Sequence, residues 1–217
     1  MGRPKEGYKL QDGTRIPGVT SITGRFKDSG GLITWANQQG LAGVNIKDVK
    51  EQAADAGTLA HEMVEAHLTG GNPLDAVVGK DAAVVDQASK GYSNYLAWER
   101  QTSLKVVSWE QTLVSELYRY GGTPDAIVEI DGKLSLADWK SSNAVYSDYL
   151  LQISAYHQLW SENFPDKPLH GSHLLRFSKD YGDFVHYYFD DLDDAWKMFQ
   201  LLRQAYELDK ALKKRVK

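Results

Sequence analysis

The sequence contains no cysteine among its 217 residues. Disulfides, thiolate catalysis, zinc–sulfur sites and iron–sulfur clusters are therefore excluded within this chain. No apolar run approaches the ~18 residues that a membrane-spanning helix needs. A metal ion could be held only by His, Asp, Glu or backbone oxygen atoms, which suits Mg²⁺ or Mn²⁺ better than the softer metals.

The first ten residues, MGRPKEGYKL, lack the apolar stretch of a secretory signal peptide. Position 6 is Glu, so the Ser or Thr of a myristoylation site is also missing. We therefore expect a cytoplasmic, intracellular protein with no membrane partner. The net charge of −4 does not favour a nucleic-acid partner, because polyanion binders usually carry a positive field. A local basic groove and a bound divalent cation are compatible with a negative total.

Hydrophobic residues make up 42% of the chain and charged residues 25%, as in an ordinary soluble globular domain. The length allows one domain with a sizeable core. No internal repeat, low-complexity tract or linker divides the chain. We expect an accessory cap at residues 1–46 and the core at 47–217, together forming one integrated domain.

Hydrophobic periodicity and turn residues predict an α/β sandwich around a mixed sheet, with the core order α-βββ-α-β. Residues 7–24 are predicted to form a short hairpin followed by a loop with Pro17. The predicted helices are 32–39, 47–68, 80–102, 147–163 and 192–213, and the predicted strands are 104–114, 123–130, 133–139, 173–177 and 184–189.

Residues 121–142 read GGTPDAIVEIDGKLSLADWKSS and have the pattern of a β-hairpin. Asp131-Gly132 is the strongest two-residue turn signal, because a type I′ turn needs positive φ at both central positions. With that two-residue loop, Ile130 faces Lys133. Each step away from the turn moves one residue back along the first strand and one forward along the second, so Asp125 faces Asp138. A β-bulge in either strand would break this register.

The two aspartates would be direct cross-strand neighbours, with Cβ atoms about 4.5–5.5 Å apart. The next pair inward, Ile127 with Leu136, is apolar, so two unneutralised acids at this partly buried surface would be unfavourable. A Mg²⁺ or Mn²⁺ ion between them would remove the repulsion. Lys140 shares the face of Asp138, because side chains alternate along a strand. The alternative is that Asp125 is a turn residue and Asp138 pairs with Lys140 in solvent.

His61 and Glu65 lie four residues apart in GTLAHEMVEAHL, hence on one helix face. The zinc-protease motif H-E-x-x-H needs a histidine where Glu65 stands, so a metalloprotease would lack a ligand. Either His61 joins the two aspartates in a mixed nitrogen and oxygen metal site, or it packs within its helix while Glu65 is solvated. Glu110 is either a further acidic neighbour or a solvated residue.

Four motifs occur in a fixed order along the chain. They are Gly57-Thr-Leu-Ala-His61, Gly122-Thr-Pro-Asp125, Asp138-Trp-Lys140 and Gln152-x-x-x-Tyr156. This ordered set resembles the PD-(D/E)XK nuclease superfamily and, within it, the RecB-type branch that includes phage exonucleases. The opening, from DGTRIPGVTSI through LITWA, also resembles the leading segment of phage-type members, so the likeness covers most of the chain.

The resemblance implies a restriction-endonuclease-like core and assigns roles at the matching positions. It implies that Mg²⁺ or Mn²⁺ is bound by His61, Asp125, Asp138 and the backbone carbonyl of Trp139, with a less close match at Glu65. Lys140 would position or activate the attacking water. Gln152 and Tyr156 would orient Lys140 or the nucleic-acid backbone, although spacing alone favours a core Tyr156 and a surface Gln152. The cysteines that bind an iron–sulfur cluster in some relatives are absent, so no such cofactor is expected.

The function implied is a metal-dependent DNA exonuclease that hydrolyses phosphodiester bonds at DNA ends, in recombination, repair or phage DNA processing. The alternative is a nucleic-acid-binding module on the same fold that no longer cuts. The intact Asp125, Asp138 and Lys140 argue for the enzyme, because loss of cutting commonly leaves gaps in that set. The preference for single- or double-stranded DNA and any helicase or recombination partner stay open.

Overall fold

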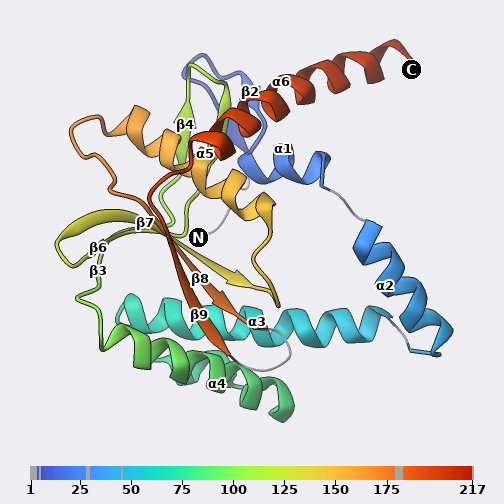
Figure 1. The fold of residues 1–217 in the computed structure, drawn as a ribbon, viewed down its shortest axis with the longest axis vertical. Helices are drawn as coiled ribbons and strands as arrows, with labels where there is room; N and C mark the ends of the chain where they lie inside the picture. The colour runs from blue at the N-terminus through green and yellow to red at the C-terminus, as the bar shows by residue number, and fades with distance from the viewer. Residues whose placement is uncertain (1–3, 5, 28–29, 45, 179–182, 217) are drawn as a thin grey trace.

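The fold is built around a five-stranded mixed sheet with helices on both faces (Figure 1). A computed structural model describes residues 4, 6–27, 30–44, 46–178 and 183–216. The helices are α1 Val19–Arg25, α2 Gly30–Leu41, α3 Ile46–Leu68, α4 Ala82–Glu99, α5 Ser147–Asn163 and α6 Asp193–Arg215, with a 3-10 helix η1 at Pro73–Val77. The strands are β1 Tyr8–Lys9, β2 Arg15–Ile16, β3 Lys105–Trp109, β4 Leu113–Ser115, β5 Tyr120–Gly122, β6 Ala126–Ile130, β7 Lys133–Ser141, β8 Ser172–Phe177 and β9 Phe184–Phe189.

The central sheet has the strand order β3-β6-β7-β8-β9, with β7 and β8 parallel and the other pairs antiparallel. The parallel pair follows from α5, which connects the two strands as a crossover helix. The predicted α/β class, with a mixed sheet and the core order α-βββ-α-β, is thereby confirmed. Helix α4, strand β9 and helix α6 complete the sheet and its two covering layers.

The β6–β7 hairpin has the predicted turn and register. Asp131 and Gly132 have φ angles of 50° and 76°, as a type I′ turn requires. The ladder runs from Ile130↔Lys133 to Ala126↔Ala137 without interruption. The one irregularity on this side of the sheet lies in the pairing of β3 with β6, so it leaves the hairpin register intact.

Each face of the sheet has its own apolar core. Ala137 and Trp139 pack with α3 and α4 on one face, as do Val128 and Phe177. Ile127 and Leu136 pack with α5 and α6 on the other face. Figure 1 shows α3 and α4 on the lower side of the sheet and α5, α6 and α1 on the upper side. Side chains alternate along β7, so Asp138 and Lys140 point to the α5 face with Leu136.

The prediction of a loop after Pro17 was wrong for residues 19–25, which form helix α1. Its β-branched residues disfavour a helix, but Val19 and Ile22 are buried against the layer of α5 and α6. Burial therefore overrides local propensity here. This part of the predicted accessory segment is packed into the core.

The predicted strand at 104–114 was wrong as a single element. Glu110 has a φ of 44°, a left-handed conformation that ends the run of β3. The chain then turns into β4, which pairs with β5 in a separate two-stranded sheet. This break places Glu110 next to the start of β6, where its N–H donates to the carbonyl oxygen of Asp125 at 2.8 Å.

Helix α3 approaches the end of β7 at a glycine. A Cβ atom on Gly57 would lie 2.3 Å from the Cβ atom of Ser141, a distance that real contacts do not reach. Gly57 therefore permits the close packing of α3 on the strand that carries Asp138 and Lys140. Within the described residues, no helix has the length and apolar character that crossing a membrane requires.

Candidate active site

Asp125 and Asp138 meet at the end of the β6–β7 ladder. The last ladder pair is Ala126↔Ala137, and beyond it the N–H of Trp139 donates to Oδ2 of Asp125 at 2.8 Å. The Asp125 carboxylate thus accepts the hydrogen bond that a backbone carbonyl of β6 would accept if the ladder continued. It lies close enough to Asp138 for its charge to act on that group. Asp125 therefore lies near Asp138, one position beyond the last ladder pair.

Asp138 is fully buried and has an unusual environment for a carboxylate. Lys140 Nζ lies 2.5 Å from its Oδ2, so this oxygen has a charged partner. Oδ1 of Asp138 has no hydrogen-bond donor among the described residues. Burial raises the pKa of Asp138 to about 7; Lys140 opposes this shift and Asp125 adds to it.

Lys140 stays charged in this nearly buried position. Burial alone would lower its pKa, but the negative charges of Asp138 and Asp125 raise the pKa above its usual value. Its Nζ also lies 5.4 Å from the centroid of the Tyr149 ring, within the range of a cation–π interaction. The proposed solvent-exposed pair of Asp138 with Lys140 was wrong, because Asp138 is inaccessible to water.

Helix α5 contributes the predicted pair Gln152 and Tyr156. Nε2 of Gln152 donates to the hydroxyl oxygen of Tyr156 at 2.9 Å. Burial, and then the charge of Asp138, raise the pKa of Tyr156 well above its usual value, so the hydroxyl keeps its own proton to donate. A Cβ atom at Gly122 would lie 2.6 Å from the Tyr156 ring, so glycine is required beside it.

Tyr149 was not among the predicted site residues. It lies on α5 three residues before Gln152 and seven before Tyr156, a spacing that puts all three side chains on one helix face. That spacing is the signal by which the sequence could have shown it. The face of α5 toward the sheet therefore presents two tyrosine rings and an amide to the β7 residues Asp138 and Lys140.

The donor set fits a hard divalent cation. Asp138 offers a buried Oδ1 without a donor and an Oδ2 beside the Lys140 ammonium, and Asp125 offers a second carboxylate beside it. The N–H and C=O of one strand residue point to the same side, so the Trp139 carbonyl is directed past the start of β6, toward Asp125. Mg²⁺ is commonly held by one or two carboxylates together with waters and substrate phosphates. Two carboxylates and one carbonyl meet that requirement.

His61 lies on the other face of the sheet. Its ring stacks on the indole of Trp139, with centroids 6.2 Å apart and planes 14° apart, and it also contacts Trp109. Nε2 of His61 is buried and has no hydrogen-bond partner among the described residues. Across that part of the chain, no three His, Asp or Glu side chains are grouped closely enough to hold a metal ion. A ligand role for His61 therefore stays a prediction.

Glu65 and Glu110 are the two remaining acidic candidates. Glu65 is half-buried, one turn beyond His61 on α3. Glu110 is half-buried and adjoins Asp125 through its backbone N–H. The structure therefore brings together Asp125, Asp138, Lys140, Gln152 and Tyr156, and it leaves ligand roles for Glu65 and Glu110 as predictions.

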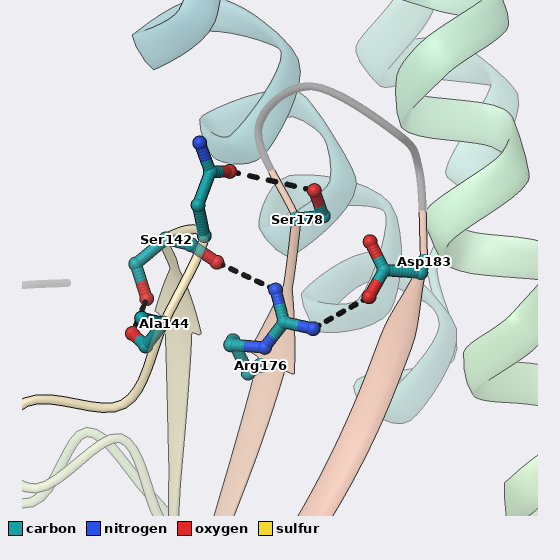
Figure 2. A network of polar contacts seen from close by, with 6 residues as sticks. Ser142, Ala144, Arg176, Ser178 and Asp183 are labelled. Atoms are coloured by element: carbon teal, nitrogen blue, oxygen red, sulfur yellow. Dashed lines mark hydrogen bonds and ion pairs between the residues drawn. The ribbon is translucent and has the colours of Figure 1, made fainter.

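Arg176 supports the end of β7 from the neighbouring strand. It is in register with Lys140 across the parallel pair and is buried. Its guanidinium donates to the carbonyl oxygen of Ser142 at 2.9 Å and to Oδ2 of Asp183 at 2.5 Å (Figure 2). Ser142 in turn donates from its backbone N–H to the carbonyl oxygen of Phe177. A charged residue within the apolar run SHLLRF was the sequence signal for this support.

Replacing Arg176 by Met is expected to lower the free energy of unfolding by about 1–3 kcal/mol, because the Ser142 carbonyl loses a charged donor in a buried position. Urea denaturation followed by circular dichroism measures this change. Lys197→Met is the matched control, because the ion pair of Lys197 with Asp194 at the start of α6 is exposed on both sides and contributes little. Equal losses in the two variants would contradict the support of β7 by Arg176.

Comparisons with known proteins give structural neighbours but no sequence family. No protein-family model and no curated protein matches the chain. A candidate exonuclease from Eubacterium rectale is similar over 69% of this chain and 68% of its own, with 13% identity and a TM-score of 0.47. An alkaline exonuclease from Laribacter hongkongensis is similar over 76% of this chain and 90% of its own, with 12% identity and a TM-score of 0.40.

A complex of the Laribacter enzyme with dAMP matches equally well, with a TM-score of 0.41. These neighbours are a candidate exonuclease and two structures of the alkaline exonuclease. All three TM-scores are below 0.5, so the function has to be inferred from the geometry of the site itself.

Proposed function

We propose that this chain is a metal-dependent nuclease, and specifically an exonuclease that hydrolyses phosphodiester bonds of DNA. The observation that carries the proposal is the fully buried Asp138, which has Lys140 as its ion-pair partner, Asp125 beside it and an Oδ1 without a donor among the described residues. One ammonium does not balance two adjacent carboxylates, so a further cation would complete the site. Two carboxylates and a lysine next to a cation are the chemistry that phosphodiester hydrolysis needs.

The roles follow from the positions of the side chains. Asp125 and Asp138 would hold the cation together with the Trp139 carbonyl. When bound, such a cation stabilises charge on the phosphoryl oxygens and lowers the pKa of a bound water. Lys140 places a fixed positive charge beside that position and orients the attacking water through its ammonium hydrogens. The Tyr156 hydroxyl, held by Gln152, can donate to an oxygen at the same face.

A direct test uses linear DNA, single- and double-stranded, labelled at either the 5′ or the 3′ end, with an RNA strand of the same sequence alongside. With Mg²⁺ or Mn²⁺ we expect progressive loss of nucleotides from DNA ends, and with EDTA we expect none. The labelled end that disappears first gives the polarity. Binding of DNA without cleavage in either metal would contradict the proposal and favour a binding module, and cleavage unchanged by EDTA would contradict metal dependence.

A further inference from the structure

Helix α6 carries a second apolar surface in addition to the one that packs on the body of the protein. Phe199 is fully buried on the inner side, where α6 contacts α5 and α1. On the outer side lies a row of apolar residues that we call the outer stripe. It consists of Met198, Leu201, Ala205, Leu208 and Leu212. Its four large side chains are between 48% and 66% exposed, so no described part of the chain covers them.

The spacing of the outer stripe is that of a coiled-coil seam. Successive members are separated by three, four, three and four residues. Apolar residues at these alternating steps occupy the a and d positions of two heptads, which form a narrow seam along one side of a helix. The inner contact of α6 uses other positions, such as Phe199 and Tyr206. The outer stripe therefore has the pattern of a surface that packs against another helix.

The charges along α6 identify the helix that fits. The first turn contains Asp193 and Asp194, and the last turn contains Lys213, Lys214 and Arg215. In a parallel pair of two α6 helices, like charges would meet at both ends. In an antiparallel pair, the acidic turn of each copy lies beside the basic turn of the other, and the helix dipoles also oppose.

The outer stripe also suits a two-fold axis. In an antiparallel pair, an a residue of one helix lies opposite a d residue of the other. With the charged ends matched, Leu201 of one copy faces Ala205 of the other, where the small side chain lets the helices approach closely. Met198 of one copy then lies opposite Leu208 of the other, and Asp193 lies opposite Lys213. Figure 1 shows the last turns of α6 extending beyond the rest of the molecule.

We propose that two copies of this chain associate through their α6 helices, packed antiparallel along the outer stripe with the two-fold axis between Leu201 and Ala205. The contact is isologous, so it closes as a dimer and does not extend into a filament. This dimer does not depend on the nuclease activity proposed above.

The association is tested by sedimentation velocity over a range of protein concentrations. We expect the unmodified chain to shift from monomer to dimer as concentration rises, and the double variant Leu201→Asp, Leu208→Asp to stay monomeric. Leu74→Asp is the matched control, because Leu74 in η1 is 65% exposed and Leu208 is 66% exposed; this variant should dimerise like the unmodified chain. A monomer at every concentration, or a dimer that survives the double variant, would overturn the proposal.

The orientation is tested by disulfide cross-linking, which the absence of native cysteine makes unambiguous. The variants Met198→Cys and Leu208→Cys are oxidised separately and as an equimolar mixture. We expect covalent dimers in the mixture and almost none in either variant alone, because the two positions face each other only across an antiparallel pair. Covalent dimers of each variant alone would show a parallel pair and overturn the antiparallel arrangement.

Discussion

Replacing Asp138 by Asn is expected to reduce Mg²⁺-dependent cleavage of DNA by about 10²–10⁴-fold, because the site loses the buried carboxylate that holds the cation. Lys140→Met should reduce the rate by about 10²–10³-fold, since it removes a preorganised charge from beside the reacting oxygens. Initial rates on an end-labelled duplex at saturating Mg²⁺ measure both changes.

The same hairpin supplies matched controls. Asp131 and Lys133 carry the same types of side chain at the opposite end of the hairpin, where both are exposed. Asp131→Asn and Lys133→Met should therefore leave the rate within about twofold, as expected for exposed positions outside the site. Circular dichroism and urea denaturation of all four variants separate loss of chemistry from loss of fold. Undiminished cleavage by folded Asp138→Asn or Lys140→Met would refute the roles assigned to these residues.

A second large effect is expected in the pH dependence of stability without metal. Asp138 has a pKa near 3.8 in the unfolded chain and about 7 in the folded chain, because it is buried. Between these values the folded state holds one more proton than the unfolded state, so the free energy of unfolding falls as pH rises. The decrease in the free energy of unfolding that Asp138 contributes is at most about 1.4 kcal/mol per pH unit and levels off above pH 7.

Other acidic groups contribute slopes of their own, so the comparison is with Asp138→Asn, which lacks this titration. Denaturation in EDTA is measured for both proteins between pH 4 and pH 9, and the difference between their free energies of unfolding is plotted against pH. We expect that difference to change through the window from about pH 4 to pH 7 and to be constant above it. A constant difference throughout would contradict the raised pKa.

Addition of Mg²⁺ is expected to restore the free energy of unfolding that is lost at high pH. A cation that binds only the folded state stabilises it, and protons compete with it for Asp138 below pH 7. The apparent affinity should therefore rise about tenfold per pH unit up to pH 7 and then level off. The melting temperature with and without Mg²⁺ reports this directly, and the shift should vanish in Asp138→Asn. A shift that persists in that variant would place the cation elsewhere.

Local geometry explains what could be predicted from the sequence. Asp131-Gly132 admits one favoured turn, and that turn sets the register that brings Asp125 toward Asp138. The alternation of a strand puts Lys140 on the same face, and the helical repeat does the same for Gln152 and Tyr156. Such arrangements depend on residues within one hairpin or one helix, so the sequence alone determines them.

Tertiary packing decided the rest. Arg176 reaches the end of β7 only because β7 and β8 are parallel neighbours, although they are far apart in the sequence. Helix α1 forms despite its β-branched residues because Val19 and Ile22 are buried. The environment of His61 depends on how α3 packs against Trp139, which no spacing within the helix determines. Sequence periodicity specifies which side chains share a face, whereas the burial of a face and its partner depend on distant segments of the chain.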